Sequence, residues 1–412
     1  MKLHIDKDRL ARELDQLASI SDAPAPVVTR VVFTEADLRA RAFLKGLCSE
    51  AGLQIREDAV GNTFVRWVGI EPKLPAVGTG SHIDAIPNAG RFDGTVGVLG
   101  GLEAIRALAR AGFQPRRSIE LVIFTAEEPT RFGVGCLGSR LLSGALDASA
   151  GGRLKDREGK TLDDVRLAAN FSGSLDHIRL PDKYYHAFVE LHIEQGPILE
   201  QEHIDLGIVT AIAAPAGMRF WIEGEGGHAG AVPMADRQDA FLAAAEIALC
   251  IESAAKASGG SDTVATTGVC DVFPGAMNSI PSQVRMEADV RDIDLARRDR
   301  VLDKIMAAAE QVAARRRVSV TTEVLNADPP GRCDPMVITA LTCACEAHRA
   351  SSKRMISRAY HDSLFMSLIA PAAMLFIPCR GGVSHRPDEY ASPEAIARGT
   401  LVLAEALASL SG

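Results

Sequence analysis

The chain has 412 residues, of which 47% are hydrophobic and 24% are charged, and its formal net charge is −8. This length favours two domains, because chains of this size usually exceed the length that folds around a single hydrophobic core. The negative charge without Lys and Arg clusters argues against a nucleic-acid partner, and no apolar run approaches the roughly 20 residues of a membrane span.

The amino-terminal segment has neither the apolar core of a signal peptide nor the Arg-rich, acid-poor composition of a transit peptide. We therefore predict a cytoplasmic protein that acts on a small molecule.

The first half of the chain is predicted to form an α/β domain. Leu and Ala recur at three- and four-residue spacing within 6–20 and 35–52, which predicts two amphipathic helices. A glycine-rich loop at 90–101 opens into another helix. Strands are predicted where apolar β-forming residues run together, at 64–68, 76–81 and 118–126, and between about 187 and 211 the segments HAFVELHIE and LGIVTAIAA continue this pattern.

The pattern changes after residue 211. Strand, helix, two strands, helix and a closing strand follow one another, which predicts a compact α+β insert at 212–328. The chain then returns to helices, an apolar strand and a last helix. We therefore predict a mixed α/β domain formed by 1–211 and 329–412, with the smaller domain inserted into it.

Five residues could hold divalent metal ions. Each has an ordinary alternative, because a strand histidine is often a structural hydrogen-bonder and paired glutamates are often solvated loop charges. The strand at 118–126, however, is apolar up to its end, where two adjacent carboxylates would be costly without cations. One shared carboxylate and four further ligands would suit two ions, and the candidates are His82, Asp93, Glu128, His192 and His385.

Several segments together resemble the ureido-hydrolysing amidase branch of the aminoacylase and carboxypeptidase metallohydrolase family. They are GSHIDAIPNAGRFDG, the Glu127-Glu128 strand end, ELHIEQGPILE, GGHAGAVPM, MNSIPS with DVRD, and the SH of GGVSHRPDEY. The resemblance spans nearly the whole chain. It implies an aminopeptidase-like catalytic domain with two metal ions per subunit, and an inserted dimerisation or lid domain that forms a homodimer.

The resemblance also implies roles for the metal site. One ion would be held by His82, Asp93 and His192, and the other by Asp93, Glu128 and His385. Asp84 would support His82, and Glu127 would be the general base. Manganese is favoured by the resemblance, with zinc, cobalt or nickel as alternatives.

Other residues would bind a small ureido acid. The resemblance implies that His228 stabilises the oxyanion from the partner subunit, that Arg291 grips the substrate carboxylate and that Asn278 binds an oxygen. Gln195, Tyr360 and His361 are further candidates for the substrate pocket.

A few positions favour ureidoglycolate among the substrates of this branch. The segments 127–144, 208–216 and 357–366, with Pro129 and Tyr360, resemble members of the branch that act on ureidoglycolate more closely than those that act on other ureido acids. The implied reaction releases glyoxylate, ammonia and carbon dioxide in purine and allantoin breakdown.

Other activities stay open. Allantoate, N-carbamoyl-L-amino acids and N-carbamoyl-β-alanine are alternative substrates, and a metallopeptidase or aminoacylase would use the same metals. An inactive binding protein is disfavoured because all the ligand types and Glu127 are present. The glycine-rich segment 90–101 lacks the GxGxxG order of a dinucleotide site.

Overall fold

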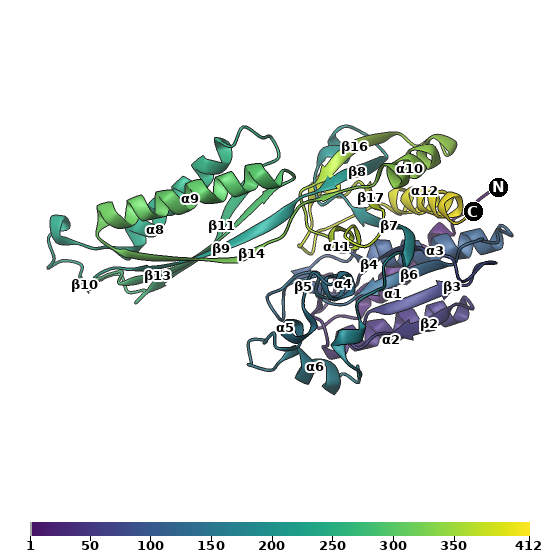
Figure 1. Cartoon of the computed structure of the whole chain (residues 1–412), viewed down its shortest axis with the longest axis horizontal. Coiled ribbons are helices and arrows are strands. Elements are labelled where there is room, and N and C mark those ends of the chain that lie inside the picture. Colours follow the sequence, from purple (N-terminus) through teal and green to yellow (C-terminus); the bar gives the residue numbers. More distant parts are fainter. Residues whose placement is uncertain (1) are drawn as a thin grey trace. The chain divides into compact units, whose positions relative to one another are not determined.

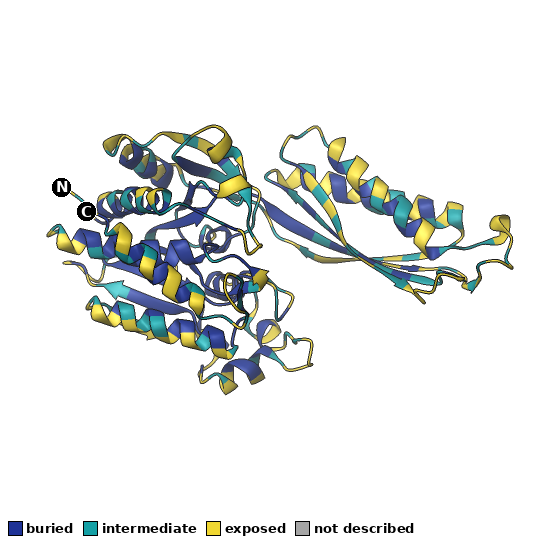
Figure 2. Ribbon diagram, turned by 180° about the vertical axis from the view of Figure 1, so that it is seen from behind, coloured by how far each residue is buried: buried dark blue, intermediate teal, exposed yellow. Residues whose placement is uncertain are grey.

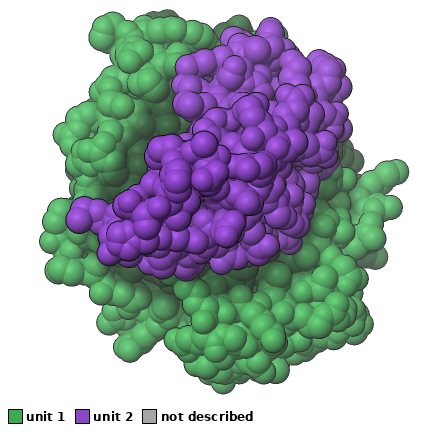
Figure 3. All heavy atoms as spheres, turned by 90° about the vertical axis from the view of Figure 1, so that its left-hand side faces the viewer, with its two compact units in different colours: residues 1–210, 332–357, 361–412 green, residues 211–331, 358–360 purple. Residues whose placement is uncertain are grey.

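A computed structural model describes residues 2–412 and divides the chain into two compact units, coloured separately in Figure 3. The larger unit takes the chain as far as Thr210, then Arg332–Ser357 and His361–Gly412. The smaller unit takes Ala211–Gly331 and, in addition, Arg358–Tyr360. Within the described residues, no helix is long and apolar enough to cross a membrane.

The larger unit is built on a nine-stranded mixed sheet (Figure 1). The order is β15-β8-β17-β7-β4-β6-β3-β2, and β16 pairs with β8. Four central strands run parallel to one another, and they are β17 (Ala372–Ile377), β7 (Tyr185–Ile193), β4 (Ala76–His82) and β6 (Ile119–Phe124). The other strands are β2 (Gln54–Glu57), β3 (Thr63–Trp67), β8 (Leu206–Ile212), β15 (Gly331–Arg332) and β16 (Ser352–Ser357).

Both faces of this sheet are covered, so its central strands are buried (Figure 2). On one face α3 (Thr95–Arg110) and α12 (Pro393–Ser411) pack against the central strands and against each other. On the other face Val122 and Phe124 of β6 join an apolar cluster with Leu137 of α4. Side chains of a strand alternate between its faces, which explains why every residue of β6 is apolar except Glu120.

Further helices complete the larger unit. They are α1 (Lys7–Ser19), α2 (Glu35–Glu50), α4 (Leu137–Ser143), α5 (Ala148–Gly152), α6 (Leu162–Ala168), α7 (Ile198–Gln201), α10 (Pro335–Ala347) and α11 (Asp362–Met366). Short 3-10 helices lie at Leu175–His177 and Arg380–Gly382 in this unit, whereas the one at Met234–Asp236 belongs to the smaller unit. The strand β1 (Val28–Arg30) pairs with β5 (Ala85–Ala89). Side-chain caps fix several helix starts; Thr34, for example, accepts a hydrogen bond from the backbone of Asp37 ahead of α2.

The smaller unit is an antiparallel sheet covered by two helices. The strand order is β11-β13-β9-β14, formed by β11 (Val264–Phe273), β13 (Gln283–Asp292), β9 (Ala214–Glu223) and β14 (Ser319–Ala327). Alternate residues of β13 are buried, and they pack with α8 (Ala240–Lys256) and α9 (Leu295–Arg316) into a separate core. A two-stranded ribbon, β10 (Gly227–His228) with β12 (Ser279–Ile280), belongs to the same unit.

Candidate metal centre and active site

The central parallel strands bring polar residues to one edge of the large sheet. β4 ends at His82, β7 carries His192 beside its last residue, and Glu127 and Glu128 follow the end of β6. The loop after β17 carries His385. Because parallel strands end at the same edge, residues far apart in sequence meet there, as is usual for binding sites in α/β sheets.

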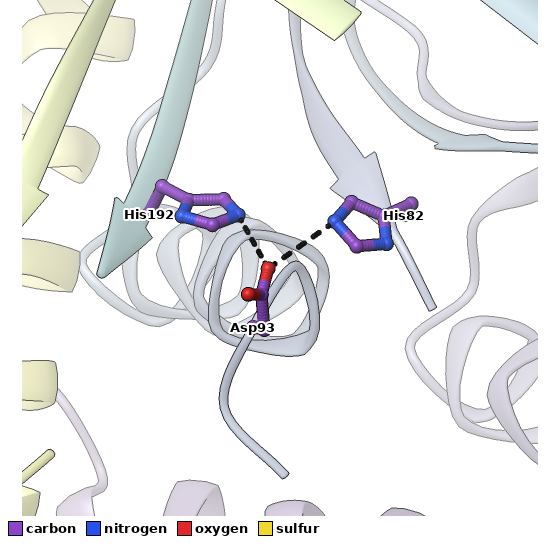
Figure 4. Close-up of side chains that lie close together, drawn as sticks. All are labelled: His82, Asp93 and His192. Carbon is purple, nitrogen blue, oxygen red and sulfur yellow. Dashed lines mark ion pairs between the residues drawn. The ribbon is translucent and has the colours of Figure 1, made fainter. Parts of the chain in front are cut away.

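The first cluster consists of His82, Asp93 and His192, all buried (Figure 4). Oδ1 of Asp93 lies 3.2 Å from Nε2 of His192 and 3.5 Å from Nε2 of His82. The opposite ring nitrogens face backbone carbonyls, with Nδ1 of His82 3.0 Å from the Asp84 oxygen and Nδ1 of His192 2.9 Å from the Ile193 oxygen. A carbonyl only accepts hydrogen bonds, so each Nδ1 carries a hydrogen and each Nε2 faces the cluster as the nitrogen that can bind a cation once it is unprotonated.

The second cluster uses the other oxygen of Asp93. Oδ2 lies 3.4 Å from Nε2 of His385, and the same nitrogen lies 3.2 Å from Oε1 of Glu128. His385 is the more open member, with 46% of its side chain exposed. The two oxygens of one carboxylate thus serve two separate groups of donors.

This donor set fits divalent cations. Unprotonated imidazole nitrogens and carboxylate oxygens are ligands for zinc, manganese and cobalt. Burial opposes protonation of His82, but the negative charges of Glu127, Asp93 and Asp84 outweigh it and raise the pKa of His82 well above its usual value. Burial likewise opposes ionisation of Asp93, yet hydrogen bonds from His192, His385 and His82 hold its pKa well below the usual range. The negative charges of this pocket therefore favour positive charge among them, which a cation held by these ligands would supply.

Glu127 lies beside the first cluster and is almost fully buried. Its Oε2 is 3.7 Å from Nε2 of His82, and the Cys136 thiol donates to its Oε1 over 3.4 Å. Burial, opposed by His82 and reinforced by the negative Glu128, raises the pKa of Glu127 well above its usual value. A carboxylate of this basicity is suited to accept a proton.

Asp84 acts on this edge in two ways. Its carboxylate was predicted to orient His82, but the His82 ring is hydrogen-bonded to the Asp84 backbone oxygen, while the carboxylate Oδ1 lies 3.7 Å away. The carboxylate accepts the backbone N–H groups of Glu127 (3.2 Å) and Glu128 (3.0 Å). Asp84 therefore fixes the turn that presents both glutamates.

Two predicted pocket residues lie at the centre. Gln195 donates from Nε2 to Oδ2 of Asp93 over 2.6 Å, while its buried Oε1 has no hydrogen-bond partner among the described residues. The ring of His361 lies 4.6 Å from that of His192 and its Nε2 lies 3.0 Å from the Ser357 hydroxyl.

The structure adds polar residues that the sequence did not reveal. Glu190 accepts hydrogen bonds from the Ser81 hydroxyl (2.8 Å) and the Ser363 N–H (3.1 Å), and it groups with His192 and His361. Asp362 accepts the Ser139 hydroxyl over 2.5 Å, and its Oδ2 has no hydrogen-bond partner among residues 2–412. Both residues lie within segments that were singled out from the sequence, ELHIEQGPILE and 357–366, but nothing in those segments set them apart, because their roles depend on contacts with distant residues.

The remaining predicted residues belong to the smaller unit. His228 is exposed on β10, and its neighbour Ala229 donates its N–H to the Asn278 oxygen over 2.9 Å. Arg291 lies near the other end of β13 and pairs with Asp289, Nε to Oδ1, at 2.7 Å. Tyr360 donates its hydroxyl to Asp328 over 2.9 Å. Their roles toward substrate stay predictions.

A mixed sheet with carboxylate and imidazole clusters at the ends of its parallel strands is the architecture of a metal-dependent hydrolase. The chain belongs to peptidase family M20/M25/M40, whose family model matches residues 78–409. Enzymes of this family are metal-dependent hydrolases.

Relatives place the chain in the ureido-hydrolysing branch of this family, as its motifs predicted. It is 52% identical over 413 residues to a ureidoglycolate hydrolase of Oryza sativa subsp. japonica, covering 99% of this chain and 85% of that protein. It is also similar to AtUAH in crystal structures with glyoxylate and with (S)-hydroxyglycine. Each of these has a TM-score of 0.93, 50% identity, and coverage of 99% of this chain and 98% of the other.

Proposed function

We propose that this protein hydrolyses the terminal ureido C–N bond of ureidoglycolate and yields glyoxylate, two molecules of ammonia and carbon dioxide. The observation that carries this proposal is the 52% identity to a ureidoglycolate hydrolase over 99% of the chain. The described site supports it, because both donor clusters and the buried Glu127 lie together at one sheet edge.

Two divalent ions, one in each cluster, would complete the site. His82, Asp93 and His192 would hold one, and Asp93, Glu128 and His385 the other. When bound, such ions lower the pKa of water and polarise the carbonyl that is attacked. Mixed imidazole and carboxylate ligands suit Mn²⁺, Zn²⁺, Co²⁺ and Ni²⁺. We favour Mn²⁺ among them because the family resemblance implies it.

Glu127 moves the proton. It accepts one from the water that attacks the ureido carbonyl carbon, and it returns this proton to the terminal nitrogen as the C–N bond breaks and ammonia leaves. The turn held by Asp84 keeps the Glu127 carboxylate beside the first cluster during both transfers. The carbamate left on the other nitrogen loses carbon dioxide, which gives hydroxyglycine.

Hydroxyglycine then eliminates its amine to give glyoxylate and the second ammonia. The complexes of the similar AtUAH protein with (S)-hydroxyglycine and glyoxylate support this order for the present chain.

The active unit is a homodimer in this proposal. His228 and Asn278 lie at the β10–β12 ribbon. Strand β13 begins at Gln283, just after this ribbon, and Arg291 lies eight residues further along it, which is roughly 26 Å at 3.3 Å per residue. A small ureido acid cannot bridge that distance. All three residues can serve one kind of site only if His228 and Asn278 reach the partner subunit while Arg291 serves its own.

The proposal is tested by ammonia release from four ureido acids offered in parallel to Mn²⁺-loaded protein. They are ureidoglycolate, allantoate, N-carbamoyl-β-alanine and an N-carbamoyl-L-amino acid. We expect a strong preference for ureidoglycolate, and a loss of about 10²-fold or more in kcat in Glu127→Gln, because general base catalysis contributes on that order. Metal content should stay unchanged, since Glu127 is not a ligand in this arrangement.

Other outcomes would redirect the proposal. Preference for another ureido acid would contradict the substrate and keep the mechanism. Activity on peptides or N-acyl amino acids alone would favour an aminoacylase or peptidase function. No activity on any of these substrates would contradict the proposal that the protein is an enzyme of this kind.

A further inference from the structure

A second carboxylate beside the metal centre has no role in the mechanism above. Glu389 lies in the loop after β17, four residues beyond His385, and only 4% of it is exposed. It is neither a member of the donor clusters nor beside the reacting atoms. Its contacts run to the loop that carries Asp93.

Both oxygens of Glu389 are engaged with the surroundings of Asp93. Oε1 accepts the backbone N–H groups of Phe92 (2.6 Å) and Asp93 (3.1 Å). Oε2 lies 2.9 Å from the Ser384 hydroxyl, which also hydrogen-bonds to Oδ2 of Asp93. Glu389 therefore holds Asp93 through its backbone and, by way of Ser384, through its carboxylate.

The fold makes room for this contact. A Cβ at Gly90 would lie 2.3 Å from Cβ and 2.6 Å from Oε1 of Glu389, so only glycine lets the two loops approach so closely. The rings of Phe92 and Tyr390 meet edge to face at 6.1 Å beside it. The two loops are thus joined by packing as well as by hydrogen bonds.

We propose that Glu389 is a positioning residue that, through Ser384 and the backbone of 92–93, aims the two Asp93 oxygens at the two donor clusters. Ser384 is the neighbour of His385, so the same contacts also fix the loop that supplies the exposed ligand. Partners behind a ligand orient it, and their removal typically weakens metal binding 10- to 100-fold. The inference rests on the metal centre of the proposed function.

Metal affinity is the measurement that tests it. Mn²⁺ dissociation constants are determined by calorimetric titration of the full-length protein, and thermal unfolding is followed without metal. We expect Glu389→Ala and Gly90→Ala to bind Mn²⁺ about 10-fold or more weakly. Asp388→Ala is the matched control, because Asp388 is exposed and its side chain pairs with the exposed Arg386 rather than with the loop of Asp93.

A conservative variant separates positioning from charge. In Glu389→Gln the amide oxygen can accept both N–H groups, and the amide nitrogen can donate to Ser384, which stays free to donate to Asp93. We therefore expect Mn²⁺ affinity close to that of the wild type. Ser384→Ala removes only the hydroxyl that links Glu389 to Asp93. If Glu389→Ala does not fold, the Mn²⁺ affinity of Ser384→Ala tests the inference in its place.

The outcomes are distinct. Unchanged Mn²⁺ affinity in Glu389→Ala, or in Ser384→Ala where the former does not fold, would overturn the inference and leave Glu389 a purely structural residue. Failure of the wild type to bind Mn²⁺ would overturn the metal centre as well. Activity on any substrate does not enter, so an incorrect substrate assignment would leave this test intact.

Discussion

Asp93 is the residue on which the two donor clusters depend. Oδ1 faces His82 and His192, and Oδ2 faces His385. Oδ2 also accepts hydrogen bonds from Gln195 and Ser384, so burial and five polar neighbours hold the carboxylate in a single orientation. The number of ions that the protein holds should therefore be set at this one side chain.

We expect Asp93→Ala to lose both ions and Glu128→Ala to lose only one. Asp93 contributes an oxygen to each cluster, whereas Glu128 contributes only to the second. Metal per protein is measured by inductively coupled plasma mass spectrometry after gel filtration. Retention of a full ion by Asp93→Ala would show that the clusters bind metal independently.

The ligand candidates could be found in the sequence, but their supporting residues could not. His82, Asp93, Glu128, His192 and His385 stand in recognisable motifs, and the structure brings all five together. Glu190, Asp362 and Glu389 also lie in segments that were singled out from the sequence, but their residue type alone did not distinguish them from their neighbours. Glu389, for example, is an acidic loop residue like its neighbour Asp388, and only the distant Phe92 and Asp93 N–H groups distinguish it.

At the scale of elements, regular periodicity was predictive and short irregular segments were not. The predicted helices at 6–20 and 35–52 correspond to α1 and α2, and the strand at 118–126 is β6, buried on both faces as expected. The short helices α4, α5 and α6 were missed. Each has at most seven residues, too few to display a helical period.

The start of α3 is an element boundary that serves the metal centre. Its N-cap is Gly94, which has a φ of 66°, and a Cβ there would lie 2.5 Å from Nε2 of His82. This close approach lets the helix begin directly beneath the first cluster. Gly112, just past the other end of α3, has a φ of 74° but no atom within 4 Å of such a Cβ.

This contrast gives a matched pair of variants. Gly94→Ala and Gly112→Ala should each lose about 1 kcal/mol of stability, because alanine is strained in the left-handed region. Only Gly94→Ala should also weaken Mn²⁺ binding, by about 10-fold or more, because His82 must move. Calorimetric titration and thermal unfolding separate the two effects. Equal Mn²⁺ affinity in both variants would show that His82 can shift without cost.

At the scale of the whole molecule, the proposed dimer predicts complementation between two defective chains. His228→Ala would damage the partner's site, and Arg291→Ala would damage its own. In a mixed dimer both defects would fall on one site and the other would be intact. The purified mixed dimer should therefore restore about half of wild-type ammonia release, since it has one intact site of two.

The test requires that the separate homodimers be nearly inactive. The variants are co-expressed with different affinity tags, and the mixed species is purified through both. Absence of recovery would show that His228 and Arg291 act on the same subunit's site or that the chain does not exchange residues between subunits.

Strand order bears on how the protein is synthesised. β17 lies between β7 and β8, although it follows both in the chain by more than 150 residues. Until a ribosome has made residue 377, the β7 edge on that side has no partner strand, and such edges invite wrong pairing. His385 emerges later still. A nascent chain thus carries an open sheet until residue 377 is made and an incomplete set of candidate metal ligands until residue 385 is made, the stage at which chaperones would be most needed.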